Sequence, residues 1–356
     1  MKLTGMLTIT LAFGAAAAWC QIQPPTGQRS GPGVQAGQDA REPEVLKACK
    51  TPPPARGGRG GPRRGAGRAP AAAGPRPYTV MEIPGVIAAG QQWKEIWEVD
   101  GNNADGIIGT KDGGLLIAQN DKSEVVKLDR NGKVSVAYRG TNTGGALAMN
   151  AKGALFLVNR GLNPSIEELA PKRKTLANRY NDDPLDCLGG VMNDLTADSK
   201  GGVYFTNTGG GSGLFYTDAK GKITQYGEKL GTNGIVLSAD EKHLFVTNGA
   251  TVAEFDVEKD GSLTNQREFG KLEGGSGGDG STFDSAGRLY VTTNAGVQVL
   301  GPDGKYLGLI PTPRGVISVA FSGPDSKTLY TVSREGDKDW IIGIPTIAQG
   351  AKGRGK

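Results

Sequence analysis

A repeated pattern of apolar strand, tight turn and second apolar strand runs through residues 78–356 and limits the fold more than any other feature. The polar turns end at residues that lie 40, 48, 40, 46 and 39 positions apart, namely residues 113, 153, 201, 241, 287 and 326. The strands that follow alternate Val, Phe, Tyr and Thr as half-buried strands require. They read LLIAQ, ALFLVN, GVYFTN, HLFVTN, RLYVTT and TLYTVS.

This period of roughly 40–45 residues, with four strands in each unit, is typical of a β-propeller. Six units predict an all-β fold, a six-bladed β-propeller with four-stranded antiparallel blades. The last unit, Val316 to Ile344, is one strand short, and Gln92–Val99 reads as a strand ahead of the first unit. We therefore expect this N-terminal strand to complete the last blade and close the propeller. A β-sandwich is the alternative, but it does not predict six matched units.

Residues 1–20 have the features of a cleaved export signal. Lys2 is followed by mostly apolar residues 7–13 and small residues 15–18. The sequence therefore predicts an exported protein, periplasmic or extracellular. A short membrane anchor is the alternative, but no apolar run reaches the ~18–20 residues that span a bilayer. We expect no membrane-spanning segment.

Residues 21–77 are rich in Pro, Gly, Ala and Arg and predict a disordered linker, because such a segment buries too little to offset its ordering entropy. Residues 1–77 hold eleven Lys and Arg against three Asp and Glu, a net charge of +8. The whole chain is +5, so residues 78–356 carry −3. This mildly acidic region argues against nucleic-acid binding. We expect a monomer with a flexible tail over residues 345–356.

A few single residues limit the chemistry. One His and three Cys exclude a multi-His metal site, a zinc ribbon and a disulfide framework. Cys49 and Cys187 could pair in an oxidising compartment, and two unpaired thiols are equally open. His243 opens a strand and is expected to be structural. Pro164–Tyr180 is a charged insertion, expected as a solvated loop or as a short helical lid.

Four of the six equivalent positions in the units carry Asp or Asn, and each of these side chains offers an oxygen. Eight residues before the turn positions stand Asp105, Gly145, Asn193, Asn233, Asp279 and Ser318, which we call the axial ring. The first strand of each blade lines the propeller axis, so these positions should surround one mouth of the channel. Two facing carboxylates need a cation, and all-oxygen ligation indicates a hard ion. The alternative is that Asp or Asn before Gly only forms turns.

The sequence also resembles a known family, the gluconolactonase, regucalcin and luciferin-regenerating enzyme family. The similarity extends over roughly residues 95–335 and is carried by NDLTADSKGGVYFTN (193–207), TNGIVLSADEKHLFVTN (232–248), DGSTFDSAGRLYVTT (279–293) and SVAFSGPDSKTLYTVS (318–333). The resemblance implies a six-bladed propeller with one divalent metal on the axis and hydrolysis of sugar lactones.

The resemblance also implies roles for members of the axial ring. Asn233 and Asp279 match metal ligands, Asp279 also matches a general base, and Asn193 matches a residue near metal and substrate. Asp105 aligns with a ligand that is Glu in the family. We expect Ca²⁺ as the ion, with Mn²⁺, Mg²⁺ or Zn²⁺ as alternatives.

These observations together predict an exported metal-dependent hydrolase of a sugar lactone or similar cyclic ester. Asp105, Asn233 and Asp279 are the expected metal ligands, and Asp279 the catalytic base. Asn193, Asn207 and Arg160 are the expected contacts for a small-molecule substrate. Asn207 could instead cap a strand, and Arg160 could be an exposed structural residue. The alternative function is a non-catalytic propeller that binds a carbohydrate, peptide or protein partner and keeps a structural metal.

Overall fold

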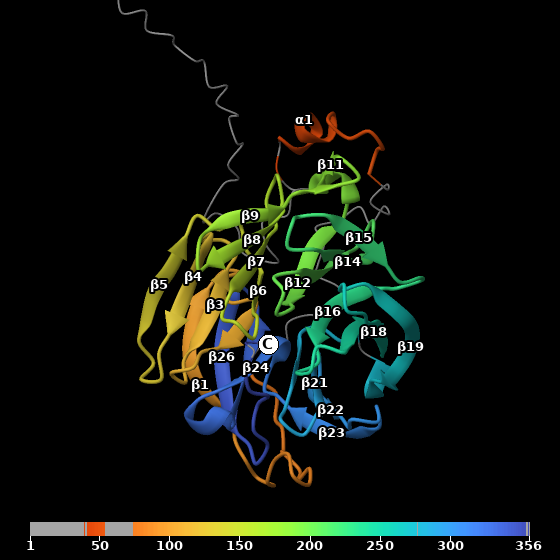
Figure 1. Cartoon of the computed structure of the whole chain (residues 1–356). Coiled ribbons are helices and arrows are strands. Elements are labelled where there is room, and N and C mark those ends of the chain that lie inside the picture. The colour runs from red at the N-terminus through yellow and green to blue at the C-terminus, as the bar shows by residue number, and fades with distance from the viewer. Residues whose placement is uncertain (1–38, 40, 54–73, 276, 354, 356) are drawn as a thin grey trace, which may run out of the picture.

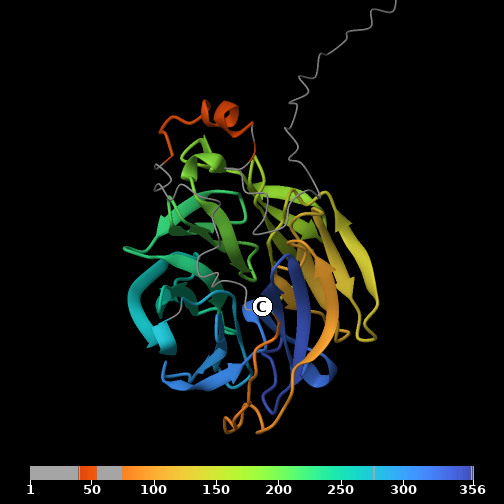
Figure 2. The ribbon, with the colours of Figure 1, turned by 180° about the vertical axis from the view of Figure 1, so that it is seen from behind.

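The computed structural model describes residues 39, 41–53, 74–275, 277–353 and 355. Six four-stranded antiparallel sheets stand around a central axis and confirm the expected six-bladed β-propeller (Figures 1 and 2). The expected export signal lies outside the described residues, as does most of the 21–77 segment. No helix in the described part of the chain is long and apolar enough to cross a membrane.

The first three blades follow one another along the chain, each running from the axis outward. Blade 1 contains β2 (Ile107–Gly109), β3 (Leu115–Gln119), β4 (Glu124–Leu128) and β5 (Val134–Arg139). Blade 2 contains β6 (Ala146–Met149), β7 (Leu155–Asn159), β8 (Ser165–Ala170) and β9 (Lys174–Ala177). Blade 3 contains β12 (Val191–Ala197), β13 (Val203–Thr208), β14 (Gly213–Thr217) and β15 (Ile223–Tyr226).

The other three blades repeat this order, except at the end of the last one. Blade 4 contains β16 (Thr232–Leu237), β17 (His243–Asn248), β18 (Thr251–Val257) and β19 (Leu263–Lys271). Blade 5 contains β20 (Ser281–Phe283), β21 (Leu289–Thr293), β22 (Gly296–Leu300) and β23 (Tyr306–Pro311). Blade 6 contains β24 (Gly315–Ser322), β25 (Thr328–Glu335), β26 (Lys338–Pro345) and, from the N-terminal side, β1 (Lys94–Asp100).

The N-terminal strand β1 closes the propeller, as the sequence predicts. It pairs antiparallel with β26, and Glu98 accepts a 2.9 Å hydrogen bond from the Trp340 indole across this pair. The outer strand of the last blade therefore comes from the start of the repeat region. The fold is circular because residues about 240 positions apart share one sheet.

The repeated turns explain the regular spacing of the units. In the first turn the Gly113 N–H donates to the Thr110 carbonyl at 2.9 Å, and Gly113 has φ +82°. A side chain is disfavoured at positive φ, so glycine suits this last turn position. The same bond joins Asn150 to Gly153 and Asp284 to Gly287 in later blades.

The hydrophobic core is divided into six clusters, and each fills the space between two neighbouring blades. Between blades 3 and 4, for example, Tyr204 and Leu214 pack with Ile235 and Val246. Alternate strand residues face the two neighbouring blades, so both faces of the inner strands are buried. This arrangement holds the inner strands, and therefore the axial ring, in a fixed position.

The segment before the repeats contains some regular structure. Within the expected linker, α1 (Glu42–Leu46) forms a five-residue helix, which departs from the prediction of an unfolded segment. Cys49 forms a disulfide with Cys187, so pairing is the alternative that the structure adopts. Cys187 lies in η2 (Leu185–Leu188), which follows the small sheet of β10 (Arg179–Tyr180) and β11 (Asp183–Pro184). The crosslink fixes this part of the segment to blade 3.

The insertion Pro164–Tyr180 was misread from the sequence. It forms neither a solvated loop nor a helical lid, but contributes β8 and β9, the outer half of blade 2. The charged residues of this segment are paired, Arg173 with Glu167, which is buried, and Lys174 with the half-buried Glu168, so their charge does not mark a solvated loop. The short segments η3 (Glu273–Gly275) and η4 (Pro324–Ser326) are 3-10 turns.

The C-terminal residues, expected as a flexible tail, run across the end of the channel that lies opposite the axial ring. Gly350 N–H donates to Ser326 and Ala351 N–H to Phe283, which belong to blades 6 and 5. Gly355 exchanges two 3.1 Å backbone bonds with Met149 of blade 2. Because these partners lie at the far ends of the inner strands, the tail covers the mouth away from the ring.

Candidate functional site

The axial ring residues lie at equivalent places in their blades. Asp105 and Asp279 precede β2 and β20, and their backbone N–H groups donate to the second strands, at Ala118 and Thr292. Gly145 makes the same bond to Val158 in blade 2. The two aspartates, Asn193 and Asn233 are all half-buried. The register inferred from the turns therefore corresponds to real structural equivalence.

The glycines after these residues are needed for close packing at the axis and do not form turns. A Cβ on Gly106 would lie 2.6 Å from Ala146 Cα of the next blade, and one on Gly234 would lie 2.0 Å from the Asp279 carbonyl oxygen. Neither glycine has positive φ. The turn-former alternative for Asp-Gly and Asn-Gly is therefore wrong, because the pairs mark where inner strands approach each other.

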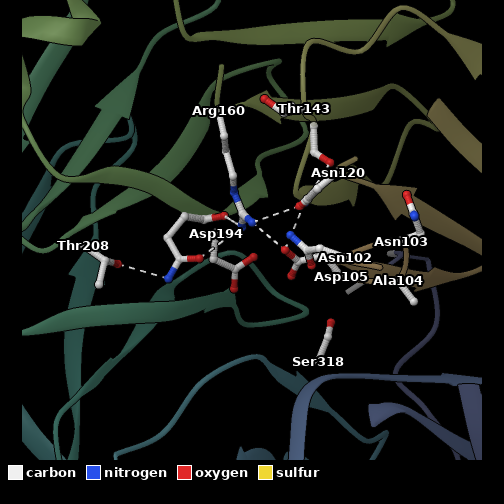
Figure 3. A network of polar contacts seen from close by, with 12 residues as sticks. Asn102, Asn103, Ala104, Asp105, Asn120, Thr143, Arg160, Asp194, Thr208 and Ser318 are labelled. Atoms are coloured by element: carbon white, nitrogen blue, oxygen red, sulfur yellow. Dashed lines mark hydrogen bonds and ion pairs between the residues drawn. The ribbon is translucent and has the colours of Figure 1, made fainter. Parts of the chain in front are cut away.

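Arg160, the residue after β7, extends its side chain into the axial ring (Figure 3). Its Nη1 lies 2.5 Å from Asp105 Oδ2 and 3.4 Å from Asn120 Oδ1. Its Nη2 donates to Asn193 Oδ1 at 3.1 Å and also to the Asn193 carbonyl. The side chain is only 8% exposed, so Arg160 is not the exposed structural residue of the alternative prediction.

The two ring asparagines are joined to each other. Asn193 Nδ2 donates to Asn233 Oδ1 and to Thr208 Oγ1, the latter at 3.0 Å. Thr208 in turn donates to the Thr232 carbonyl at 3.0 Å. A continuous chain of polar contacts thus runs from Asp105 through Arg160 to blades 3 and 4.

A second arginine, Arg334 on β25, lies beside the ring and was not identified from the sequence. Its Nε donates to Asp339 Oδ1 at 2.6 Å, and its Nη2 donates to the Ala104 carbonyl at 3.2 Å and to Asn102 Oδ1. Burial opposes its charge, but Asp339, with Asp105 and Asp279 contributing, raises the pKa of Arg334 above its ordinary value. Arg334 therefore stays charged and offsets part of the negative charge of the ring.

The remaining predicted residue, Asn207, has a structural position. It is buried, and its Nδ2 donates to the carbonyls of Gly189 and Gly211 at 2.8 and 2.7 Å. These bonds fix two loops of blade 3, as the strand-capping alternative expects. Asn120 is the asparagine that reaches the ring, where its Nδ2 donates to Asp105 Oδ2 at 3.2 Å.

The ring offers oxygen donors of the kind that a hard divalent cation prefers. They are the carboxylates of Asp105 and Asp279 and the amide oxygens of Asn193 and Asn233. The described residues contain no cluster of three or more His, Cys, Asp or Glu suited to a metal. Two of the four ring donors are amide oxygens, and an all-oxygen set fits Ca²⁺ or Mg²⁺ in kind better than a softer ion.

The fold and site define a class: a six-bladed propeller with a ring of carboxylate and amide oxygens at one mouth of its axis. The family model for the SMP-30/Gluconolactonase/LRE-like region matches residues 134–335 of this chain. The chain belongs to this family, and the resemblance stated from the sequence is confirmed.

Individual relatives agree with this assignment. The pentonolactonase XacC of Haloferax volcanii is 32% identical over 164 residues, which are 43% of this chain and 56% of that protein. The chain thus matches little more than half of that relative's length. A gluconolactonase structure from Xanthomonas campestris has a TM-score of 0.63 at 19% identity, covering 89% and 99% of the two chains. The structure of the calcium-binding protein regucalcin of Agrobacterium tumefaciens has a TM-score of 0.60 at 18% identity. The match covers 73% of this chain and 96% of that one. At these identities the structures show a shared fold.

Proposed function

We propose that the chain is an exported, metal-dependent hydrolase of a sugar lactone or similar cyclic ester. The observation that carries this proposal is the convergence of Asp105, Asn193, Asn233 and Asp279 at one mouth of the channel. Family membership and the lactonase relatives support the reaction class. The tail across the opposite end supports a site that small molecules enter from the ring side.

The Asp and Asn residues of the axial ring have separate roles in this proposal. Asp105, Asn233 and Asp279 would hold one divalent cation, with Ca²⁺ expected first, and Mn²⁺, Mg²⁺ or Zn²⁺ as the other ions to test. The cation, when bound, supplies Lewis-acid polarisation of the lactone carbonyl. The Asp279 carboxylate takes the proton of the attacking water, since a positioned carboxylate is a general base. Asn193, which lies beside these ligands, is the expected substrate contact.

The exported location is part of the same proposal. It rests on residues 1–20 of the sequence, and the Cys49–Cys187 disulfide supports it, because disulfides persist in oxidising compartments. A fractionation experiment with an antibody to the native chain tests it. Recovery of the protein in the cytoplasmic fraction would contradict it.

One observation favours the non-catalytic alternative. The Arg160 guanidinium already bonds the Asp105 carboxylate at 2.5 Å, where a cation ligand is required. A propeller that binds a carbohydrate or peptide could keep such an ion pair for structure.

Metal-dependent turnover separates the two functions. The purified chain is treated with chelator, reloaded separately with Ca²⁺, Mn²⁺, Mg²⁺ or Zn²⁺, and given a panel of aldonolactones. We expect hydrolysis that disappears on stripping and returns with one ion. Absence of turnover with every ion, together with a cation-dependent rise in Tm, would contradict the hydrolase and favour the binding protein.

A further inference from the structure

The ring position of blade 2 explains how the Arg160 side chain reaches the axis. Gly145 stands there, and a Cβ on it would lie 1.9 Å from Arg160 Cζ and 2.1 Å from Arg160 Nε and Nη1. The guanidinium therefore fills the space that a side chain at this ring position would take. Gly145 does not have positive φ, so its backbone does not require glycine. The absence of a side chain makes room for Arg160.

Arg160 occupies an oxygen that the cation would need. It bonds Asp105 Oδ2, which belongs to an expected cation ligand, and also Asn193 Oδ1 beside it in the axial ring. A guanidinium and a divalent cation repel each other, and they cannot share one carboxylate oxygen at short range without a large cost. Binding of the cation therefore requires that Arg160 leaves Asp105.

Arg160 and Arg334 differ in whether every buried donor has a partner. Arg334 is held by Asp339, Asn102 and the Ala104 carbonyl. Arg160 is attached less completely, because its buried Nε has no hydrogen-bond partner among the described residues. A buried donor without a partner costs free energy, which lowers the barrier to leaving this position.

We propose that Arg160 is a built-in competitor of the axial cation. It neutralises Asp105 and closes the ring when the cation is absent, and it withdraws toward the channel mouth when the cation binds. This inference rests on the cation of the proposed function, but not on the hydrolase reaction. In this inference, Gly145 and Arg160 together set the affinity of the axial ring for the cation.

Two variants separate the charge of Arg160 from its position. Arg160→Gln removes the charge, and Gly145→Ala displaces the guanidinium while the charge remains. Arg130→Gln makes the same chemical change at an exposed turn of blade 1 and serves as the matched control. The full chain of each protein is stripped with chelator and titrated with Ca²⁺ and Mn²⁺ by calorimetry, and its Tm is measured with and without cation.

We expect both ring variants to bind one of these ions about tenfold or more tightly than the wild type, because a competing positive charge has been removed or moved. Arg130→Gln should bind within about twofold of the wild type, since exposed charges are screened. Stripped Arg160→Gln should also melt at a lower temperature than the stripped wild type, and the cation should restore its Tm. The calorimetric affinities and the Tm values do not depend on catalytic turnover.

Equal dissociation constants for all four proteins would overturn the inference, as would failure of every protein to bind a cation. Lactone hydrolysis is measured on the same samples. Tighter binding in both ring variants without turnover in any protein supports the competitor and contradicts the hydrolase. Turnover in the wild type that persists in chelator, with no cation bound, overturns the competitor and leaves a metal-independent hydrolase.

Discussion

Breaking the buried ion pair between Arg334 and Asp339 should destabilise the fold strongly, and Asp339→Asn tests this. Asp339 is 1% exposed and accepts hydrogen bonds from Arg334 and from the backbone N–H groups of Asn103 and Ala104 at 3.0 and 2.9 Å. The amide that replaces the carboxylate turns an N–H group toward one of these donors and leaves Arg334 buried without its counter-charge. Removing one partner of a buried pair costs about 3–5 kcal/mol.

The measurement is thermal unfolding, with an exposed ion pair as the control. A loss of this size corresponds to a fall in Tm of roughly 5–9 °C for a domain of about 280 residues. Asp112 pairs with Lys127 at 2.5 Å, but their side chains are 58% and 36% exposed. Asp112→Asn should therefore change stability by less than about 1 kcal/mol. The two pairs have nearly the same N–O distance, so they differ mainly in burial and in the backbone bonds that Asp339 accepts.

The result that would refute this reasoning is an equal shift in the two variants. A fall in Tm of less than about 2 °C for Asp339→Asn would have the same meaning. Either outcome would show that the network around Arg334 does not hold blade 6 against blade 1.

Three further predictions concern catalysis, pH and the disulfide. Asp279→Asn should abolish lactone turnover with an unchanged circular dichroism spectrum, because an amide cannot take a proton; retained turnover excludes Asp279 as the base. Burial raises the pKa of Asp186 from 3.8 to about 6, so the folded state favours its neutral form. The stabilisation from the neutral Asp186 carboxyl is complete below pH 3.8 and is lost as the pH rises through about 6. The free energy of unfolding falls by up to about 3 kcal/mol over this range. Asp186→Asn should flatten this decline in urea unfolding from about pH 4 to 8, and an unchanged slope contradicts the assignment. Reduction of Cys49–Cys187 should make the α1 segment sensitive to trypsin, while protection equal to that of the oxidised protein would show that other contacts hold it.

The blade architecture could be predicted because it is local. Each unit pairs a strand with its neighbour across a short turn, and the turn residues and the alternation of side chains record this pairing directly in the sequence. The exception is Pro164–Tyr180, where paired charged residues concealed β8 and β9. Composition alone cannot separate charges that pair within a blade from charges in a solvated loop, because the pairing depends on the fold.

The axial ring was predictable for a related reason. Residues at the same distance from equivalent turns lie at the same height on their strands, so the sequence register places Asp105, Asn193, Asn233 and Asp279 at one mouth. The sequence left open whether the following glycines serve turns or close packing. The contacts of Gly106 and Gly234 with the adjacent blades answer this, because the distance between two blades is set only when the propeller closes.

The sequence by itself determined the six blades and the oxygen ring, since these depend on interactions between neighbours along the chain and on their repetition. It also indicated the closing strand, because the last unit is one strand short and an unassigned strand precedes the first unit. The tertiary structure decided what lies between the ring residues. Arg160 reaches Asp105 across 55 residues of sequence, and Arg334 reaches Asn102 across 232. No local pattern records such pairs, because a side chain on one blade meets the axis of another only after all six blades have come together. The glycine at position 145 was visible as a gap in the ring, and only the folded chain shows that an arginine fills it.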